Sequence, residues 1–312
     1  MKLAILGAPD SWYVHDLARA GNSAQQVVVV PFSRLSASVE STGIRVASRD
    51  VVLNDMDAVL VRTMPAGSLE QVVFRMDALG ALVDAGVAVV NPPRAIEVAV
   101  DKYLTSCRLQ KAGIRTPRTM LCQHADDAVQ AFHLLGGDVV LKPVFGGEGK
   151  GITRLNDEGT ARRVFQLLVS LGATLYLQQF IPHEGYDLRL LVVGQHVLGI
   201  RRSNPGDWRT NVSRGATAQP ERVTDDLRRL ALQCAQVVGA PLAGVDLLPG
   251  RDGHLHALEV NAVPGWRALS QCLSVDVAAM VWTLLEDLAA GRLLIPADIL
   301  PPPNPRRHAT RP

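Results

Sequence analysis

The stretch Leu258–Asn261 (LEVN), taken together with Gly244–Leu248 (GVDLL), decides the fold class of this 312-residue chain. Apolar residues surround the acids in both stretches, so each one predicts a buried or half-buried strand. Buried carboxylates are costly unless they are paired or bound to a cation. Two carboxylates and an amide oxygen are hard ligands that suit Mg²⁺, which often shares its sites with substrate phosphates. Asp246, Glu259 and Asn261 are therefore candidate metal ligands, and the alternative is two polar strand ends that face solvent.

A glycine-rich loop, Gly146–Gly151 (GGEGKG), follows an apolar run that ends at Lys142. Glycines let backbone N–H groups approach anionic oxygens, and a lysine adds a compact positive charge. The loop therefore predicts a hairpin that closes over phosphates, with Lys142, Gly147 and Gly149 at the nucleotide; a flexible hairpin without a ligand is the alternative. It is not a Walker motif, because Gly151 stands where that motif needs Ser or Thr, and its glycine spacing is not that of a dinucleotide fingerprint.

Two further strand patterns carry polar groups. The first, Leu175–Ile181, is followed by a proline, and its end can offer backbone groups and apolar surface to an adenine ring. The residues expected at that ring are Gln178, Gln179, Phe180 and Ile181. In the second pattern Asp187 and Arg189 alternate with leucines, which predicts a strand with one charged face.

The order of these motifs resembles the ATP-grasp superfamily, and within it the RimK-type amino-acid ligases, which add glutamate or a related amine to a carboxylate. The resemblance covers roughly residues 101–285 and is weaker over the first hundred residues. Its most subgroup-specific piece is Gly206–Gly215 (GDWRTNVSRG). The remaining motifs of the series are Asp101-Lys102, Lys142, the glycine loop, Gln178–Ile181, Asp187–Arg189, Asp246 and Glu259–Asn261.

The resemblance implies an α/β protein with an ATP-grasp fold, in which two α+β lobes clamp ATP, preceded by a small Rossmann-like pre-ATP-grasp domain. Short apolar runs at 3–6, 27–30, 58–61 and 87–90, with a helical pattern at 68–84, independently predict βα units and a mostly parallel sheet. We expect the pre-ATP-grasp domain at 1–93, the N-lobe at 94–180, the C-lobe at 181–296 and a Pro-rich flexible tail at 297–312. The lysines would then come from one lobe and the metal ligands from the other.

The resemblance also implies a mechanism. ATP phosphorylates a carboxylate, an amine attacks the acyl phosphate, and an amide forms without a covalent enzyme intermediate, so the protein supplies positioning and charge neutralisation. Mg²⁺ or Mn²⁺, expected as two ions, would bridge the phosphates. ATP contacts would include Lys102, Lys142, Asp187 and Thr210, and the catalytic candidates are Arg189, Asn211 and Arg214. The alternatives are a solvated surface lysine at 102 and arginines that only anchor substrate carboxylates.

Three residues are candidates for the substrate side. Arg62, at the end of an apolar strand pattern, can clamp a carboxylate in fork geometry. Arg202 suits a carboxylate-rich substrate, or else lies at a solvated hairpin end. Trp266 lies in Val263–Leu269 (VPGWRAL), which resembles the subset of RimK-type ligases that adds glutamate in pterin-cofactor biosynthesis.

Substrates follow from that resemblance. We expect L-glutamate to be added to a small carboxylate acceptor such as a tetrahydromethanopterin-type cofactor. The alternatives are a protein C-terminus or carrier protein as acceptor, and a catalytically silent ATP-binding regulatory protein on the same fold.

Composition fits a cytoplasmic enzyme and excludes other classes. The net charge is +2 and aromatic residues make up 4% of the chain, so nucleic acid is not an expected partner. No apolar stretch reaches membrane-spanning length, so no membrane partner is expected. The four cysteines are isolated, which predicts reduced thiols. We also expect a homo-oligomer, a dimer or a tetramer.

Overall fold

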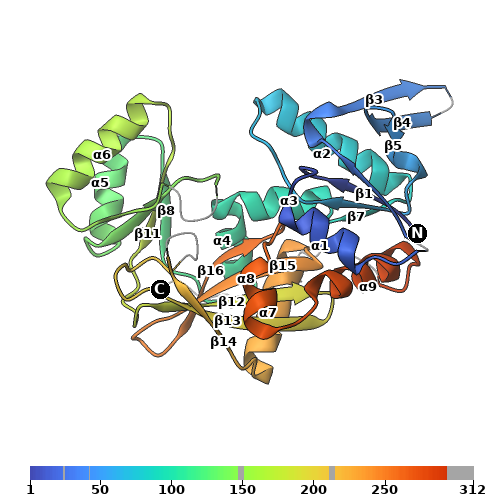
Figure 1. Ribbon diagram of the computed structural model, residues 1–312. Helices are drawn as coiled ribbons and strands as arrows, with labels where there is room; N and C mark the ends of the chain where they lie inside the picture. The colour runs from blue at the N-terminus through green and yellow to red at the C-terminus, as the bar shows by residue number, and fades with distance from the viewer. Residues whose placement is uncertain (24, 42, 147–150, 211–214, 294–312) are drawn as a thin grey trace, which may run out of the picture.

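The computed structural model describes residues 1–23, 25–41, 43–146, 151–210 and 215–293. Figure 1 shows the N-terminal part, a lobe that carries α5 and α6, and a larger lobe that holds the last third of the chain. Each part is built around its own sheet. The expected domain limits at 93, 180 and 296 remain predictions.

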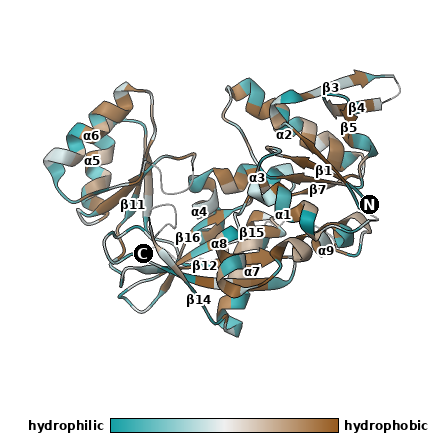
Figure 2. Ribbon diagram, in the orientation of Figure 1, coloured by the Kyte–Doolittle hydropathy of each residue, from teal (hydrophilic) through white to brown (hydrophobic). Residues whose placement is uncertain are grey.

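The N-terminal sheet is parallel, as the repeated apolar runs predicted. Figure 2 shows its strands in brown, so their residues are hydrophobic. This is expected for a parallel sheet, because helices cover both of its faces and leave little room for polar side chains. Ser68 and Gln71 form a reciprocal capping box that fixes the start of α2. The elements, in sheet order and then helices, are β2 (Gln26–Val30), β1 (Lys2–Leu6), β6 (Ala58–Val61), β7 (Ala88–Val90), α1 (Trp12–Ala20) and α2 (Leu69–Asp84).

A small antiparallel sheet projects from this part and was not predicted from the sequence. Its strands are short or polar, and the side chain of Val39 is exposed on it, so the apolar alternation that signals a strand is weak. Its elements and flanking 3₁₀ turns are β3 (Leu35–Glu40), β4 (Gly43–Ser48), β5 (Val51–Val52), η1 (Phe32–Arg34) and η2 (Leu53–Asp55).

The second sheet is antiparallel and has a core of its own, which contains Phe132, Leu141, Phe165 and Leu177. Leu141 and Leu177 pair across two strands and point into this core, so the alternating positions, including Lys142, point to the opposite face. The elements are β10 (Thr153–Leu155), β9 (Val139–Lys142), β11 (Leu175–Gln179), β8 (Thr119–Cys122), α5 (Ala125–Leu134) and α6 (Glu158–Ser170).

The third sheet, also antiparallel, is packed on both faces. Leu190 of β12 belongs to the cluster that contains α7 residues, whereas Val193 belongs to the cluster that contains α9 residues. Thr224 caps the start of α7, and Gly239, with φ 82°, ends it. The elements are β14 (Thr217–Pro220), β13 (His196–Ser203), β12 (Tyr186–Val193), β15 (Leu242–Pro249), β16 (Leu255–Asn261), α7 (Asp225–Val238), α8 (Arg267–Leu273) and α9 (Val277–Ala289).

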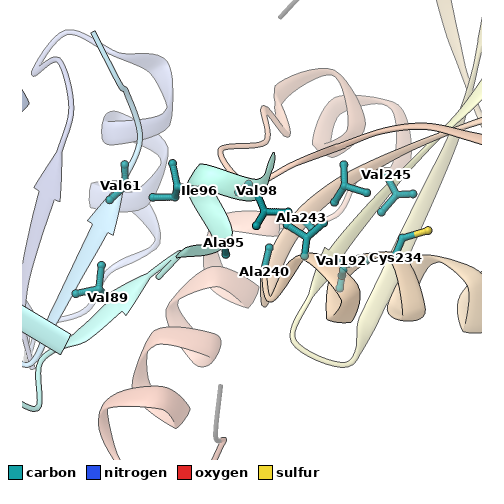
Figure 3. Packing of buried hydrophobic residues seen from close by; sticks show 14 of the residues in the cluster. Val61, Val89, Ala95, Ile96, Val98, Val192, Cys234, Ala240, Ala243 and Val245 are labelled. Atoms are coloured by element: carbon teal, nitrogen blue, oxygen red, sulfur yellow. The ribbon is translucent and has the colours of Figure 1, made fainter. Parts of the chain in front are cut away.

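Helices α3 (Pro93–Val100) and α4 (Lys102–Lys111) connect the parts. Figure 3 shows Ile96 and Val98 of α3 between Val89 of the N-terminal sheet and the C-lobe strands. Helix α4 packs against β16 and α7. The expectation that both lysines come from one lobe is therefore wrong, since the helix that begins at Lys102 shares its core with the metal-ligand strands.

No single helix among the described residues is both long and apolar enough to cross a bilayer. Within the part of the chain that the structure describes, α8 and α9 together meet that criterion by length and composition, and they are bent by 117° relative to each other.

Candidate active site

A cleft of about 680 Å³ of atom-free space lies between the second and third sheets. The cleft faces of β9 and β11 line one side, and β12, β13, β15 and β16 line the other. The sequence-predicted residues that it brings together are Lys142, Gln178, Gln179, Phe180, Ile181, Asp187, Arg202, Thr210, Asp246 and Glu259.

Strand register aligns the charged residues of the third sheet. Asp246 on β15 is paired with Glu259 on β16 and with Arg189 on β12, so three charges form one row across neighbouring strands. A register shift follows between Asp246 and Leu247, which marks a bulge beside the acids. Two residues away along each strand, Gly244 is paired with Asn261.

Gly244 provides the space that Arg189 occupies. A Cβ atom at Gly244 would lie 2.3 Å from Nη2 of Arg189, which is far inside contact distance. From this position Nη1 of Arg189 donates a hydrogen bond to Oδ1 of Asp246 at 2.7 Å. The absence of a side chain at residue 244 thus allows the guanidinium to lie against the sheet, and sequence patterning alone gave no sign of this role.

Arg202 forms ion pairs with two carboxylates in the wall of the cleft. Its Nε and Nη2 donate to the two carboxylate oxygens of Asp187 at 2.7 and 2.6 Å, and Nη2 also lies 3.1 Å from Oδ2 of Asp246. Burial alone would lower the pKa of Arg202, but the two carboxylates outweigh it and raise that pKa. Arg202 is only 7% exposed, so the alternative of a solvated hairpin end is wrong.

Asp246 is the shared acid of this cluster. Burial alone would raise its pKa, but Arg189 and Arg202 outweigh that cost and hold the pKa below its usual value. Asp187 is buried and also accepts a hydrogen bond from Thr210. The cluster of Asp187, Arg189, Arg202 and Asp246 is thus paired in the absence of any ligand.

The two lysines have neutral hydrogen-bond partners. Nζ of Lys142 donates to Oε1 of Gln178 at 2.6 Å, and Nζ of Lys102 donates to the carbonyl oxygen of Gly146 at 2.5 Å. Among the described residues, neither ammonium forms a salt bridge. Burial lowers the pKa of both, that of Lys142 to about 8, while Glu259 partly offsets the effect. Lys142 lines the cleft, so its positive charge is available to an anion there.

Gln178, the partner of Lys142, is itself held in place. Its Nε2 lies 3.2 Å from Oγ1 of Thr119 and 3.3 Å from the hydroxyl of Tyr176. That hydroxyl is 3.0 Å from Oγ of Ser106 on α4. These contacts fix the orientation of the amide, so its oxygen faces the lysine.

The far end of the cleft is apolar and aromatic. Arg154 stacks over the ring of Phe180 at 3.5 Å, and Trp208 meets the same ring edge-on. The N–H groups of Gln179 and Phe180 donate to the carbonyls of Arg118 and Asp138, and the expected contacts of this segment with an adenine remain a prediction. The side chains of Phe180 and Ile181 still give the cleft an apolar wall.

The donor set fits a hard divalent cation. Glu259 is half-buried and its pKa is raised, first by burial and then by Asp246, so a cation would relieve its charge. Oδ1 of Asn261 accepts the N–H of Val263 at 2.8 Å, which orients the amide. Within the described ranges, no three or more His, Cys, Asp or Glu residues gather in a cluster able to hold a metal ion. Two acids and an amide suit Mg²⁺ that completes its shell with water and phosphate oxygens.

Arg62 and Trp266 do not line this cleft. The guanidinium of Arg62 lies 4.6 Å from the ring centre of Tyr13 and 4.4 Å from that of Trp266, and its Nη2 donates to the carbonyl of Pro264 at 2.9 Å. Burial lowers the pKa of Arg62 to about 10. Its side chain is enclosed between two rings, so the expectation that it clamps a substrate carboxylate does not fit this structure. The contacts of Arg62 instead hold the end of β6 against the loop that follows β16, the strand of the metal ligands.

Four predicted site residues lie outside the described residues: Gly147, Gly149, Asn211 and Arg214. Their roles remain predictions from the sequence.

The family model of the RimK-like ATP-grasp domain matches residues 99–285. The chain belongs to the RimK-like ATP-grasp family. This assignment confirms the resemblance and the expected ATP-grasp fold, and the match includes every residue that lines the cleft between the two lobes.

Relatives of this ATP-grasp chain are named as glutamate ligases. It is 32% identical over 268 residues to a tetrahydromethanopterin:alpha-L-glutamate ligase from Methanosarcina acetivorans, covering 77% of this chain and 82% of that protein. It is 29% identical to a probable alpha-L-glutamate ligase from Vibrio vulnificus, covering 92% of this chain and 95% of the relative.

Solved structures show the same fold. The ATP-grasp ligase PsnB complexed with a minimal precursor superposes with a TM-score of 0.71 at 23% identity, covering 93% of this chain and 98% of PsnB. A RimK domain ATP-grasp protein from Sphaerobacter thermophilus gives a TM-score of 0.70 at 24% identity, covering 91% and 99%. A further PsnB structure contains Mg and ADP.

Proposed function

We propose that this protein is an ATP-dependent carboxylate–amine ligase that adds L-glutamate to a small carboxylate acceptor through an acyl phosphate. The observation that carries the proposal is the arrangement of Lys102 and Lys142 around Glu259, which partly offsets the lowering of their pKa by burial, while neither lysine has a carboxylate partner within hydrogen-bond distance among the described residues. An anion would pair with the two lysines, and its bound cations would pair with Glu259. The names of the relatives support glutamate as the amine and a tetrahydromethanopterin-type acceptor.

The residues around the cleft match the demands of phosphoryl transfer. Lys102 and Lys142 would bind phosphate oxygens, and the apolar end of the cleft at Phe180 and Ile181 would hold the base. The acceptor carboxylate would attack the γ-phosphorus, with ADP as leaving group. The amine of glutamate would then attack the acyl carbon, and phosphate would leave as the amide forms.

Asp246, Glu259 and Asn261 would hold Mg²⁺ or Mn²⁺, which we propose to be two ions. When bound, these ions would neutralise negative charge on the phosphates. Arg189 would stabilise charge that develops on the transferred phosphoryl group or on the tetrahedral intermediate. From the sequence, Asn211 and Arg214 are proposed to assist in the same step.

The test is a panel of amino acids and acceptors assayed for ADP release and product mass. We expect ADP release that requires an acceptor and an amine together, with a product heavier by one glutamate residue. Controls are Glu259→Gln, which should be inactive, and Glu158→Gln on the distant helix α6, which should be active. Product only on a peptide or carrier protein would favour the alternative acceptor class, and ATP binding without any product would favour a regulatory protein.

A further inference from the structure

The hairpin formed by β3 and β4 extends beyond the body of the N-terminal part (Figure 1). Leu35 packs against the hydrophobic core that contains residues of α2, and Val46 is buried in that core. Val39 and Ile44 lie on the same face of the hairpin, nearer its turn, where their side chains are 83% and 51% exposed. The apolar face of the hairpin therefore continues past the core that covers its base.

The two edges of this three-stranded sheet differ. Strand β5 pairs with the end of β4, and Asn54 closes the rest of that edge. Its Oδ1 accepts the N–H of Val46 at 2.7 Å, and its Nδ2 donates to the carbonyl of Ile44 at 3.2 Å. Strand β3 forms the other edge, and among the described residues it pairs with β4 alone. Lysine, proline or a bulge commonly protects such an edge, but Leu35–Glu40 (LSASVE) contains neither residue and its register is regular.

The backbone direction shows which groups face the free edge of β3. The N–H and C=O groups of successive strand residues point to opposite edges. Because the two β4 groups that Asn54 binds point away from β3, their cross-strand partners Ala37 and Val39 point away from β4. Leu35 also faces the free edge but presents only its carbonyl, because its N–H donates to the carbonyl of Phe32. Both backbone groups of Ala37 and Val39 are therefore available to another strand.

The free edge is complementary to itself. Since only Leu35, Ala37 and Val39 face it, a second β3 must pair these residues with one another. Antiparallel pairing centred on Ala37 uses the whole strand and sets apolar residues opposite apolar ones. The cross-copy pairs are Leu35 with Val39, Ser36 with Ser38, Ala37 with Ala37, and Arg34 with Glu40.

Arg34 and Glu40 supply the charge complementarity. Both residues are exposed, and neither forms an ion pair within the part of the chain that the structure describes. They lie at opposite ends of β3, about 20 Å apart along the strand, so they do not meet within one chain. Antiparallel pairing brings each of them opposite the other residue of the second copy, once on each side of the axis.

We propose that a second copy of this chain binds along β3, so that the two three-stranded sheets form one antiparallel sheet about a two-fold axis at Ala37. The N–H of each Ala37 donates to the carbonyl of the other, and the N–H of each Val39 donates to the carbonyl of Leu35 of the second copy. Val39 then lies beside Leu35 of the second copy on the face that α2 covers, so its exposed side chain gains apolar contact. This interface does not depend on the ligase proposal.

A single pair of strands buries less than the roughly 1,200 to 2,000 Å² of a standard interface, so the dimer should be reversible, with a Kd on the order of 10 µM. Sedimentation equilibrium of the full chain from about 1 to 300 µM measures this constant. We expect a transition from monomer to dimer within that range.

Ala37→Pro tests the backbone contact. Proline removes the N–H that faces the free edge, and because this group points away from β4, the hairpin loses no hydrogen bond. Loss of both hydrogen bonds at the axis should weaken the dimer at least about tenfold, with little change in the thermal midpoint of the dilute monomer. The matched control Ala37→Ser retains the N–H and should leave the Kd within about twofold of the original value.

Charge reversal tests the register. Arg34→Glu or Glu40→Arg sets like charges opposite each other on both sides of the axis, and each should weaken the dimer about threefold to tenfold. The double variant Arg34→Glu/Glu40→Arg restores opposite charges and should return the Kd to within about threefold of the original value. Arg45→Glu, exposed on β4 and one strand away from the free edge, makes the same change in net charge and should alter the Kd less than about twofold.

A chain that stays monomeric up to about 300 µM would overturn the inference. So would a dimer whose Kd is unchanged by Ala37→Pro, or a double charge variant that remains as weak as the single reversals. If Ala37→Pro lowers the thermal midpoint, the charge reversals decide alone, because they leave the backbone of the hairpin intact.

Discussion

The two walls of the nucleotide cleft carry their charges in different ways. On the C-lobe wall, Arg189 and Arg202 pair with Asp187 and Asp246 at 2.6 to 3.1 Å. On the opposite wall, Lys142 donates to an amide oxygen, and Lys102, at the start of α4, likewise donates to a neutral group, a backbone carbonyl. Glu259 faces both sides and lowers the cost of the buried lysines without forming a salt bridge with either of them.

This difference separates stability from binding. A buried arginine and its carboxylate partners neutralise one another, and removal of one partner leaves an uncompensated buried charge. The lysines and Glu259 instead cost stability in the empty protein, and that cost is recovered only when phosphates and cations arrive. Substitution of Arg202 should therefore lower stability, whereas substitution of Glu259 or Lys142 should affect turnover or ATP binding.

The largest expected effect is on turnover by Glu259→Gln. The substitution retains the shape of the side chain and removes the charge that would bind a cation, so ADP release should fall on the order of a thousandfold. Burial raises the pKa of Glu259, so its ionised form destabilises the empty protein at neutral pH, and the thermal midpoint of the variant should stay the same or rise. Near-normal ADP release would contradict the metal assignment.

Arg202→Met tests the paired side. The variant leaves Asp187 and Asp246 buried without this cation, and the free energy of unfolding should fall by about 3 to 5 kcal/mol. The matched control is Arg251→Met, which removes an exposed ion pair with Glu184 and should cost less than about 1 kcal/mol. Urea unfolding of both proteins measures the difference, and similar losses would show that the buried cluster is not a stabilising unit.

Arg189→Ala should lower kcat about a hundredfold with little change in KM for ATP, if the guanidinium stabilises developing charge. Gly244→Ala should also lower kcat although Arg189 is still present. The added Cβ would occupy the space of the guanidinium and displace it. Gly80→Ala on α2, where a Cβ meets no atom within 4 Å, is the control. A raised KM for the acceptor with unchanged kcat would instead make Arg189 a substrate anchor.

The smallest effect concerns Lys142. Lys142→Met should weaken ATP binding about tenfold to a hundredfold, as expected for loss of a charged hydrogen bond, and should not lower the thermal midpoint of the empty protein. Lys111→Met, at the exposed end of α4, should change neither quantity. Unaltered ATP affinity in Lys142→Met would make this lysine structural.

The pH dependence sharpens the same prediction. The pKa of Lys142 is about 8 in the folded chain, against 10.5 for a free lysine, so the unfolded chain binds more protons between these values. Stability relative to Lys142→Met should therefore rise as pH increases from about 8 to 10.5. ATP favours the protonated amine, so binding at pH 8 should take up about half a proton, measured by calorimetry in buffers of different ionisation enthalpy.

The sequence by itself determined the parallel strands of the N-terminal part, the two acid-bearing strands and the ATP-grasp motif order. Each of these depends on local apolar periodicity or on residue types at short spacing, which a chain carries without reference to distant residues. The paired acids Asp246 and Glu259 were predicted for that reason, and the register places them directly opposite each other.

Only the tertiary structure decided the partners of the charged side chains. Arg189 and Asp246 are 57 residues apart, and whether an arginine meets a carboxylate, an aromatic ring or solvent depends on strand register and on how the parts pack. Arg62 meets Tyr13 and Trp266 because the N-terminal sheet contacts the loop after β16. The space at Gly244 likewise exists only where separate strands meet, which no local pattern encodes.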